Sequence, residues 1–184
     1  FLMQKKFLPW DQVIAQRLVK PLSKTPVTPN QLTLITAVLA FFGAGLLASG
    51  DREWANWGAS LFVFARFLDH FDGELARLKG MKTKFGYYLD YATGMGSYAA
   101  FFLALGFGFR ENFFGHWSII IGAIGALAAI VGAFSNIAMD RYNGNDETGD
   151  AAGYPGFAGF ELEDGIYLLA PITWLGYLYP FFLA

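Results

Sequence analysis

Three acidic residues lie at helical spacing within a stretch of the chain that is otherwise apolar. Asp69 and Asp72 are three residues apart, and Asp90 follows after a short polar turn. A charged side chain at the centre of a membrane helix costs about 2.5–3.5 kcal/mol on insertion scales, so three carboxylates need a compensating cation, partner charge or water. The chain has no cysteine and no suitably placed histidine. Hard oxygen ligands therefore favour Mg²⁺, Mn²⁺ or Ca²⁺ over zinc or copper.

The composition is that of an integral membrane protein. Of 184 residues, 55% are hydrophobic, 18% aromatic and 15% charged. Apolar stretches of about 19 residues or more are long enough to cross roughly 30 Å of hydrocarbon. They predict an all-α integral membrane protein, a helical bundle with transmembrane helices at residues 31–49, 54–79, 84–109, 117–139 and 165–184. The net charge is −2, and no nucleic-acid partner is expected.

Lysine and arginine predict the orientation, because loops retained in the cytoplasm carry an excess of positive residues. Such residues precede the first predicted helix and crowd the turn between the second and third: Lys5, Lys6, Arg17, Lys20, Lys24, Arg77, Lys79, Lys82 and Lys84. Arg52 and Arg110 mark the opposite side. The N-terminus, the turn at 79–84 and the Gly- and Asp-rich loop 140–160 should thus face the cytoplasm. In a bacterium or archaeon the membrane would be the cytoplasmic membrane, with the acidic site open to the cytoplasm.

The chain divides into a juxtamembrane segment, 1–27, and a transmembrane domain, 28–184. Residues 7–22 form a helical pattern with Asp11 and Arg17 away from an apolar face made of Trp10, Val13, Ile14 and Leu18. This amphipathic pattern is typical of a helix that lies in the membrane interface. A cytoplasmic helix packed on the domain is the alternative.

The first transmembrane helix has a clear start signal. Thr28 is a suitable N-cap, and Pro29 occupies the first helical position, where its missing N–H costs nothing. Asn30 and Thr33 would then lie at the cytoplasmic mouth of the bundle, as polar contacts or as part of the helix cap.

The second and third predicted helices form an antiparallel hairpin that brings the carboxylates together. The turn is centred near Met81, so Asp72 and Asp90 should lie at equal depth, on the order of 10 Å inside the helix ends at a rise of 1.5 Å per residue. One stripe of the second helix holds Asp69, Asp72 and Ala76, and one stripe of the third holds Gly86, Asp90 and Gly94. Small residues on these stripes allow close approach of the backbones.

These residues resemble the CDP-alcohol phosphotransferases, also called CDP-alcohol phosphatidyltransferases. The pattern of that family is D-x-x-D-G-x-x-A-R, eight residues, then G-x-x-x-D-x-x-x-D. It is matched at the family's spacing by Asp69, Asp72, Gly73, Ala76, Arg77, Gly86 and Asp90, while the last aspartate is replaced by Gly94. The resemblance covers about residues 25–110. It implies six transmembrane helices, one more than the five predicted here, and a homodimer in membrane lipid.

The resemblance also implies an activity. A family member of phospholipid synthesis transfers a phosphatidyl or phospho-alcohol group from a CDP-alcohol, such as CDP-diacylglycerol, to a small alcohol acceptor and releases CMP. By the resemblance, Asp69, Asp72 and Asp90 would bind Mg²⁺ or Mn²⁺, of which the family holds two ions. Substrate would contact Asn30, Gly73, Ala76, Arg77 and Gly86, with Arg77 paired to a phosphate or to an aspartate.

Gly94 stands where the family has its proposed catalytic base and fourth metal ligand. Loss of a general base typically costs about 10²- to 10⁴-fold in rate, and one of the two cation sites would be weakened. The alternatives to an active enzyme are a catalytically impaired member that binds CDP-alcohol or metal without turnover, and a transporter-like bundle with an intramembrane acidic site.

Further charged residues adjoin the motif. Arg66 precedes Asp69 by three residues, and an ion pair between them is expected ahead of substrate binding. His70 is a candidate substitute base, although its side chain should point about 100° away from Asp69. Glu161, Glu163 and Asp164 favour a solvated helix start, with substrate contact as the alternative.

Overall fold

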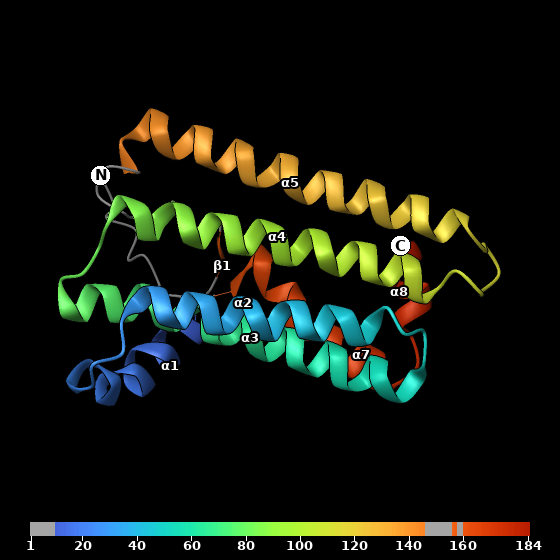
Figure 1. Ribbon diagram of the computed structural model, residues 1–184, viewed down its shortest axis with the longest axis horizontal. Helices are drawn as coiled ribbons and strands as arrows, with labels where there is room; N and C mark the ends of the chain where they lie inside the picture. Colours follow the sequence, from blue (N-terminus) through green and yellow to red (C-terminus); the bar gives the residue numbers. More distant parts are fainter. Residues whose placement is uncertain (1–9, 146–155, 158–159) are drawn as a thin grey trace.

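Four long helices lie side by side along the long axis of the molecule (Figure 1). The computed structural model describes residues 10–145, 156–157 and 160–184. The four helices are α2 (Pro29–Leu47), α3 (Arg52–Lys79), α4 (Lys84–Gly108) and α5 (Trp117–Asn143). The first three agree with the predicted spans to within two residues, and α5 continues one turn beyond its predicted end. Successive helices are antiparallel, and α5 lies at the edge of the bundle against α4.

Local signals fix the start of α2 and the α3–α4 turn. Thr28 is the N-cap of α2 as predicted: its side chain accepts a hydrogen bond from the Gln31 N–H, and the Gln31 side chain accepts one from the Thr28 N–H, with Pro29 in the first turn. Helix α3 ends at Gly80, whose φ of +63° is left-handed. Helix α4 begins after Thr83, whose side chain accepts a hydrogen bond from the Gly86 N–H. These caps set the hairpin that carries the acidic residues.

The prediction of one continuous helix at 165–184 is wrong. This segment contains a 3₁₀ helix and two short α-helices: η2 (Leu162–Leu168), α7 (Leu169–Trp174) and α8 (Leu178–Leu183). Helix α7 ends at Gly176, where φ is +84°, and the Tyr177 N–H donates to the Ile172 carbonyl at 2.9 Å. Hydropathy detects the apolar run but not this left-handed turn, which closes the helix after six residues.

Two short strands, β1 (Gly156–Phe157) and β2 (Phe160–Glu161), pair antiparallel before η2. They lie in the second half of the loop expected at 140–160, and β2 ends one residue beyond it. Residues 146–155 and 158–159 of that loop lie outside the described residues.

Helix α1 (Trp10–Val19) packs on α3 and is followed by the 3₁₀ helix η1 (Lys20–Lys24). Its small face joins a buried cluster made of Ala15, Val19, Phe71 and Leu75. Three residues of the predicted interfacial face remain exposed: Trp10, Ile14 and Leu18. The helix therefore has a face docked on the bundle and a second apolar face that is free for the membrane interface.

Asp11 differs from the sequence expectation, which placed it on the polar side of α1. It is 2% exposed, because it begins the same stripe as Ala15 and Val19 and so turns toward α3. Its carboxylate accepts hydrogen bonds from His70 Nε2 at 2.8 Å and from the Tyr167 hydroxyl at 2.9 Å. Burial alone would raise the pKa of Asp11, but the hydrogen bond and charge of His70, with the bond from Tyr167, lower this pKa below its ordinary value. A charged contact thus fixes α1 to α3 and η2.

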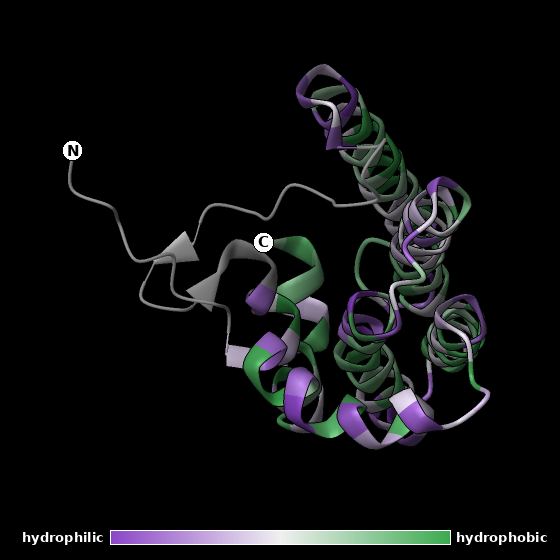
Figure 2. Ribbon diagram, turned by 90° about the vertical axis from the view of Figure 1, so that its left-hand side faces the viewer, coloured by the Kyte–Doolittle hydropathy of each residue, from purple (hydrophilic) through white to green (hydrophobic). Residues whose placement is uncertain are grey.

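The surface of the bundle suits a membrane. Among the described residues, α2 and α5 are long and apolar enough to cross one. Helix α5 exposes large apolar side chains along its length, namely Trp117, Ile120, Ile124, Leu127, Val131 and Phe134. Figure 2 shows the molecule from the end that carries α1. Hydrophilic residues gather at the helix ends nearest the viewer, and the helical turns behind them are mostly hydrophobic. The acidic hairpin reaches this polar end.

Candidate active site

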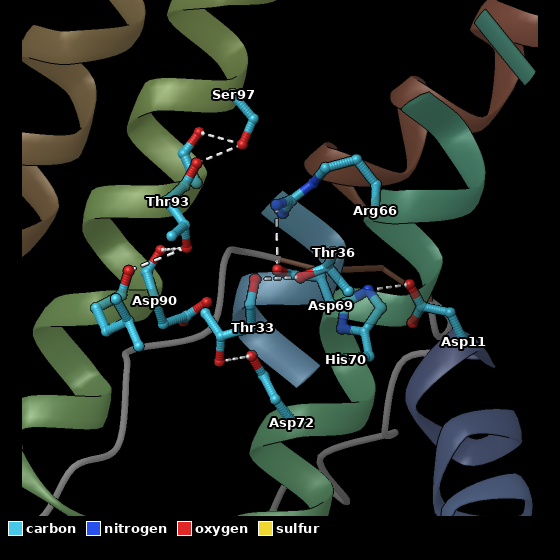
Figure 3. Close-up of polar contacts among 12 residues, drawn as sticks. Asp11, Thr33, Thr36, Arg66, Asp69, His70, Asp72, Asp90, Thr93 and Ser97 are labelled. Carbon is cyan, nitrogen blue, oxygen red and sulfur yellow. Dashed lines mark hydrogen bonds and ion pairs between the residues drawn. The ribbon is translucent and has the colours of Figure 1, made fainter. Parts of the chain in front are cut away.

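Three carboxylates meet between α3 and α4. Asp69 and Asp72 come from α3 and Asp90 from α4, and one oxygen of each lies within 4.8 Å of the others. Figure 3 shows them approaching one another across the hairpin. The antiparallel geometry expected from the sequence thus produces one cluster. An all-oxygen carboxylate set at this separation fits a hard divalent cation.

Asp72 is held from the neighbouring helix α2. It is 7% exposed, and its carboxylate accepts a hydrogen bond from the Thr33 hydroxyl (Figure 3). Thr33 therefore takes no part in the helix cap, which Thr28 provides. The signal for this role is the stripe of small residues on α2, where Thr33 precedes Ala37 and Ala40 at helical spacing and so faces the bundle.

Arg66 forms the expected ion pair with Asp69, with 3.0 Å between Nη1 and Oδ2. Its guanidinium also lies over the ring of Tyr98 on α4, 4.9 Å from the ring centre. Gly94 is on the same side: a Cβ added at Gly94 would lie 3.9 Å from Arg66 Nη1. Position 94 therefore faces the arginine beside the carboxylate cluster.

A pocket opens next to the carboxylates, at the polar end of the bundle. The open space within it is about 620 Å³ when the solvent at its mouth is included. Its walls come from α2, α3, α4 and the α3–α4 turn. They include every residue that the sequence proposed for substrate, namely Asn30, Gly73, Ala76, Arg77 and Gly86, together with Asp72 and Asp90. Asp69 lies deeper, next to Arg66.

The two glycines of the pocket differ in their surroundings. A Cβ at Gly86 would lie 3.1 Å from Asn30 Oδ1, so this glycine allows α4 to approach α2. A Cβ at Gly73 would meet no atom within 4 Å. Gly73 is thus not needed for packing within the chain, and its missing side chain leaves room in the pocket.

Arg77 differs from its expected partners. It forms an ion pair with Glu74, the residue one turn earlier, which is 4% exposed. This partner is neither the phosphate nor the aspartate expected from the sequence. The arginine side chain is half-exposed and lines the pocket with Lys82. Positive charge therefore lies at the mouth of the pocket, while the carboxylates lie at its base.

His70 does not face the carboxylates. Its Nε2 binds Asp11 at 2.8 Å, and its ring points toward α1 (Figure 3). The geometry thus gives no support to His70 as a substitute base. Of the three acids at the start of the last segment, Asp164 accepts a hydrogen bond from Trp10 Nε1 at 3.2 Å, and the side chains of Glu161 and Glu163 lie outside the described residues.

Sequence reasoning missed Asp140, which joins α5 to the site helix. This residue is 1% exposed, and its Oδ2 accepts hydrogen bonds from the hydroxyls of Tyr87 and Tyr91, each at 2.8 Å. Tyr87 also lines the pocket. The available signal was the spacing of Tyr87 and Tyr91, which places both on one face of α4.

Comparison with known proteins gives one family. The sequence profile described as CDP-alcohol phosphatidyltransferase matches residues 26–154, more than half of the chain and the whole hairpin. The chain is 44% identical over 80 residues to phosphatidylinositol phosphate synthase of Corynebacterium glutamicum, covering 43% of this chain and 35% of that protein. It is 43% identical over 63 residues to CDP-diacylglycerol–glycerol-3-phosphate 3-phosphatidyltransferase of Cereibacter sphaeroides, covering 34% and 28%. The matches thus span about a third of these relatives.

The fold resembles that of a solved membrane enzyme. The crystal structure of Mycobacterium tuberculosis phosphatidylinositol phosphate synthase with CDP-DAG bound superposes with a TM-score of 0.61. The superposition covers 91% of both chains at 19% sequence identity. At that identity the likeness shows the fold, and it agrees with the all-helical membrane class predicted from composition.

Proposed function

This chain belongs to the CDP-alcohol phosphatidyltransferase family, and from that premise we propose that it transfers a phosphatidyl or phospho-alcohol group from a CDP-alcohol to an alcohol acceptor and releases CMP. The observation that carries the proposal is the three-carboxylate cluster at the base of a pocket with a positive mouth. A transporter-like acidic site would not require the seven motif residues that this chain shares with the family at the family's spacing. Family membership therefore favours the enzyme.

The pocket suits a CDP-linked lipid. Gly73 and Ala76 leave one wall of α3 open, which would admit the nucleotide against the helix backbone. Arg77 and Lys82 at the mouth would attract the diphosphate, because phosphate oxygens bind strongly to charged nitrogen donors. CDP-diacylglycerol is the donor that we propose, since a solved structure with the same fold binds it.

Asp69, Asp72 and Asp90 would bind Mg²⁺ or Mn²⁺. A bound divalent ion supplies charge neutralisation for the phosphoryl oxygens on which negative charge develops during transfer. The contribution of the chain is to hold its ligands in place: Thr33 binds Asp72 from α2, and Arg66 binds Asp69 from the preceding turn of α3. Asn30, beside Gly86, would add a neutral polar contact at the mouth.

In the transfer, an oxygen of the acceptor alcohol attacks the β-phosphorus, the bond from that phosphorus to the CMP oxygen breaks, and the hydroxyl proton passes to a base. Position 94 offers no base, because it is glycine. Among the described residues that line the pocket, the carboxylate oxygens of the cluster would be the proton acceptors. We expect slower turnover than an additional carboxylate would allow.

A second candidate function rests on the same glycine. A chain that lacks a dedicated base could bind CDP-alcohol and metal without turnover. Two measurements separate these functions. In the first, the protein in liposomes is given CDP-diacylglycerol, Mg²⁺ and an acceptor, and the release of CMP is measured. In the second, the melting temperature is measured with and without CDP-diacylglycerol. The acceptors are an inositol phosphate and glycerol 3-phosphate, which occur in the names of the relatives. CMP release supports the enzyme, and thermal stabilisation by CDP-diacylglycerol without CMP release supports a protein that binds its ligand without turnover.

Asp90→Asn is the decisive variant in this assay. We expect CMP release to fall at least about a hundredfold, because the divalent ion loses a ligand and its charge stabilisation is worth several kcal/mol. The melting temperature in detergent should stay equal or rise, since one of three like charges is removed. Unchanged CMP release would contradict a role for the cluster in the reaction. Chelation of the metal by EDTA should reproduce the loss in the unmodified protein.

We also propose that the pocket faces the cytoplasm and that the protein is a homodimer. The orientation rests on the positive residues near the pocket, such as Lys79 and Lys82, against Arg52 and Arg110 at the other end. Because the chain has no cysteine, a single introduced cysteine reports its own side of the membrane to a thiol reagent that cannot cross it. Lys82→Cys should react from the cytoplasmic side, and Glu111→Cys should react from the opposite side. Labelling of Lys82→Cys from the outside would contradict the orientation.

Single-step photobleaching at every protein density in liposomes would contradict the dimer.

A further inference from the structure

Arg66 is a fixed positive charge within the carboxylate cluster. Its Nη1 lies 3.0 Å from Asp69 Oδ2, and the side chain is 11% exposed. The guanidinium rests on the ring of Tyr98, so α3 supplies the charge and α4 holds it in place. Arginine stays protonated at all accessible pH values, and its planar group matches a carboxylate. This charge is therefore part of the site whether or not a metal ion is bound.

The guanidinium also faces position 94. That position follows Asp90 by one turn of α4, on the stripe that carries the third carboxylate. An added Cβ there would lie 3.9 Å from Arg66 Nη1. A carboxylate at position 94 would accordingly lie within reach of the arginine. Arg66 occupies the space between Asp69 and the stripe of α4 beyond Asp90.

We propose that Arg66 is a positioning residue that takes the place of one cation, so that the cluster binds a single divalent ion. The inference rests on the proposed function, because it assigns the same carboxylates to metal. The charges support it: three carboxylates are balanced by one divalent ion and one guanidinium. Two metal ions about 3.5–4 Å apart would need further ligands to stabilise them. The next position on the stripe, Gly94, supplies none.

The arginine has a second consequence for Asp69. A charge-assisted hydrogen bond to Oδ2 orients this carboxylate and leaves Oδ1 available to the cluster. Arg66 would thus act on the bound ion through Asp69 and would not contact the substrate. A role of this kind changes the number and affinity of bound ions, whereas a merely structural arginine would change only stability.

The experiment is a count of Mn²⁺ bound per chain, by electron paramagnetic resonance of free Mn²⁺ in detergent without substrate. The unmodified protein should bind one ion. Gly94→Asp should still bind one, because Arg66 pairs with the new carboxylate. The double variant Arg66→Met with Gly94→Asp should bind two. The double variant Arg66→Lys with Gly94→Asp, which keeps the charge, is the matched control and should bind one ion.

Each outcome decides between the two proposals. Two ions in the unmodified protein, or in Gly94→Asp alone, would overturn the role of Arg66 and leave the metal site intact. No ion in the unmodified protein would overturn the metal site, on which the proposed function also depends. One ion in an Arg66→Met double variant that melts at the temperature of the unmodified protein would overturn the role of Arg66. If the Arg66→Met double variant does not fold, Arg66→Gln with Gly94→Asp takes its place and should likewise bind two ions; one ion in a folded protein would overturn the role of Arg66.

Discussion

Glycine has opposite roles in two regions of this molecule. In the body of the bundle it brings helix backbones into contact: a Cβ at Gly58 of α3 would lie 2.7 Å from the Gly43 carbonyl oxygen of α2, and a Cβ at Gly106 of α4 would lie 2.6 Å from the Ser118 carbonyl oxygen of α5. At the site end a Cβ at Gly73 would meet nothing within 4 Å. The same residue type thus holds the fold together in one region and leaves open space in a pocket wall in the other.

The difference follows from the physics of helices in lipid. Lipid tails are as apolar as leucine, so helix association there depends on close packing more than on hydrophobic burial. The glycine contacts between α2 and α3 and between α4 and α5 supply such packing away from the site. The site end can then carry charged residues and an open pocket, because the packing that holds it lies elsewhere in the bundle.

The largest effect on stability is expected for Gly58→Ala. The new methyl group would meet backbone atoms of α2, which cannot move aside without separating the helices, and overpacking of this kind costs about 1–3 kcal/mol. Thermal unfolding in detergent measures it. Gly45→Ala is the matched control, since a Cβ at that position on α2 meets nothing within 4 Å. Equal melting temperatures for the two variants would remove the packing role assigned to Gly58.

A smaller effect, on binding alone, is expected for Gly73→Leu. The side chain would enter the pocket that the nucleotide is proposed to occupy, and we expect at least about a tenfold loss of CDP-diacylglycerol affinity, equivalent to about 1.4 kcal/mol. The melting temperature without ligand should not fall. Gly132→Leu on α5 is the control. A Cβ at Gly132 also meets no atom within 4 Å, but this residue does not line the pocket. Equal affinity in both variants would show that Gly73 does not line the nucleotide site.

The smallest effect is expected for Tyr91→Phe, which tests the hydrogen bonds that Tyr87 and Tyr91 of α4 donate to Asp140 of α5. Removal of the hydroxyl takes one hydrogen bond from the buried Asp140, worth about 0.5–1.5 kcal/mol. CMP release should be nearly unchanged, since the pocket is lined by Tyr87 and not by Tyr91. A loss of activity without a change in melting temperature would mean that the hydrogen bonds to Asp140 belong to the site.

Local signals made much of the fold predictable. The cap at Thr28 and the bounds of α2, α3 and α4 depend on residues within one or two turns, and the predicted bounds agree closely with the structure. The segment 165–184 was predicted wrongly, because hydropathy averages over residues and does not register the left-handed turn at Gly176. Convergence of the carboxylates could be predicted because a short turn makes depth along two antiparallel helices a matter of counting.

The sequence by itself determined the membrane class, the hairpin and the chemistry of its three carboxylates, since all of these depend on residue type and short-range spacing. Only the tertiary structure decided which distant side chains meet in and around the site. Asp11 turned inward to His70, Asp140 met two tyrosines of α4, and Arg66 came to face position 94. Such contacts join residues far apart in the chain, and their partners depend on how helices rotate against one another. That rotation is settled by packing over the whole bundle, which no local pattern encodes.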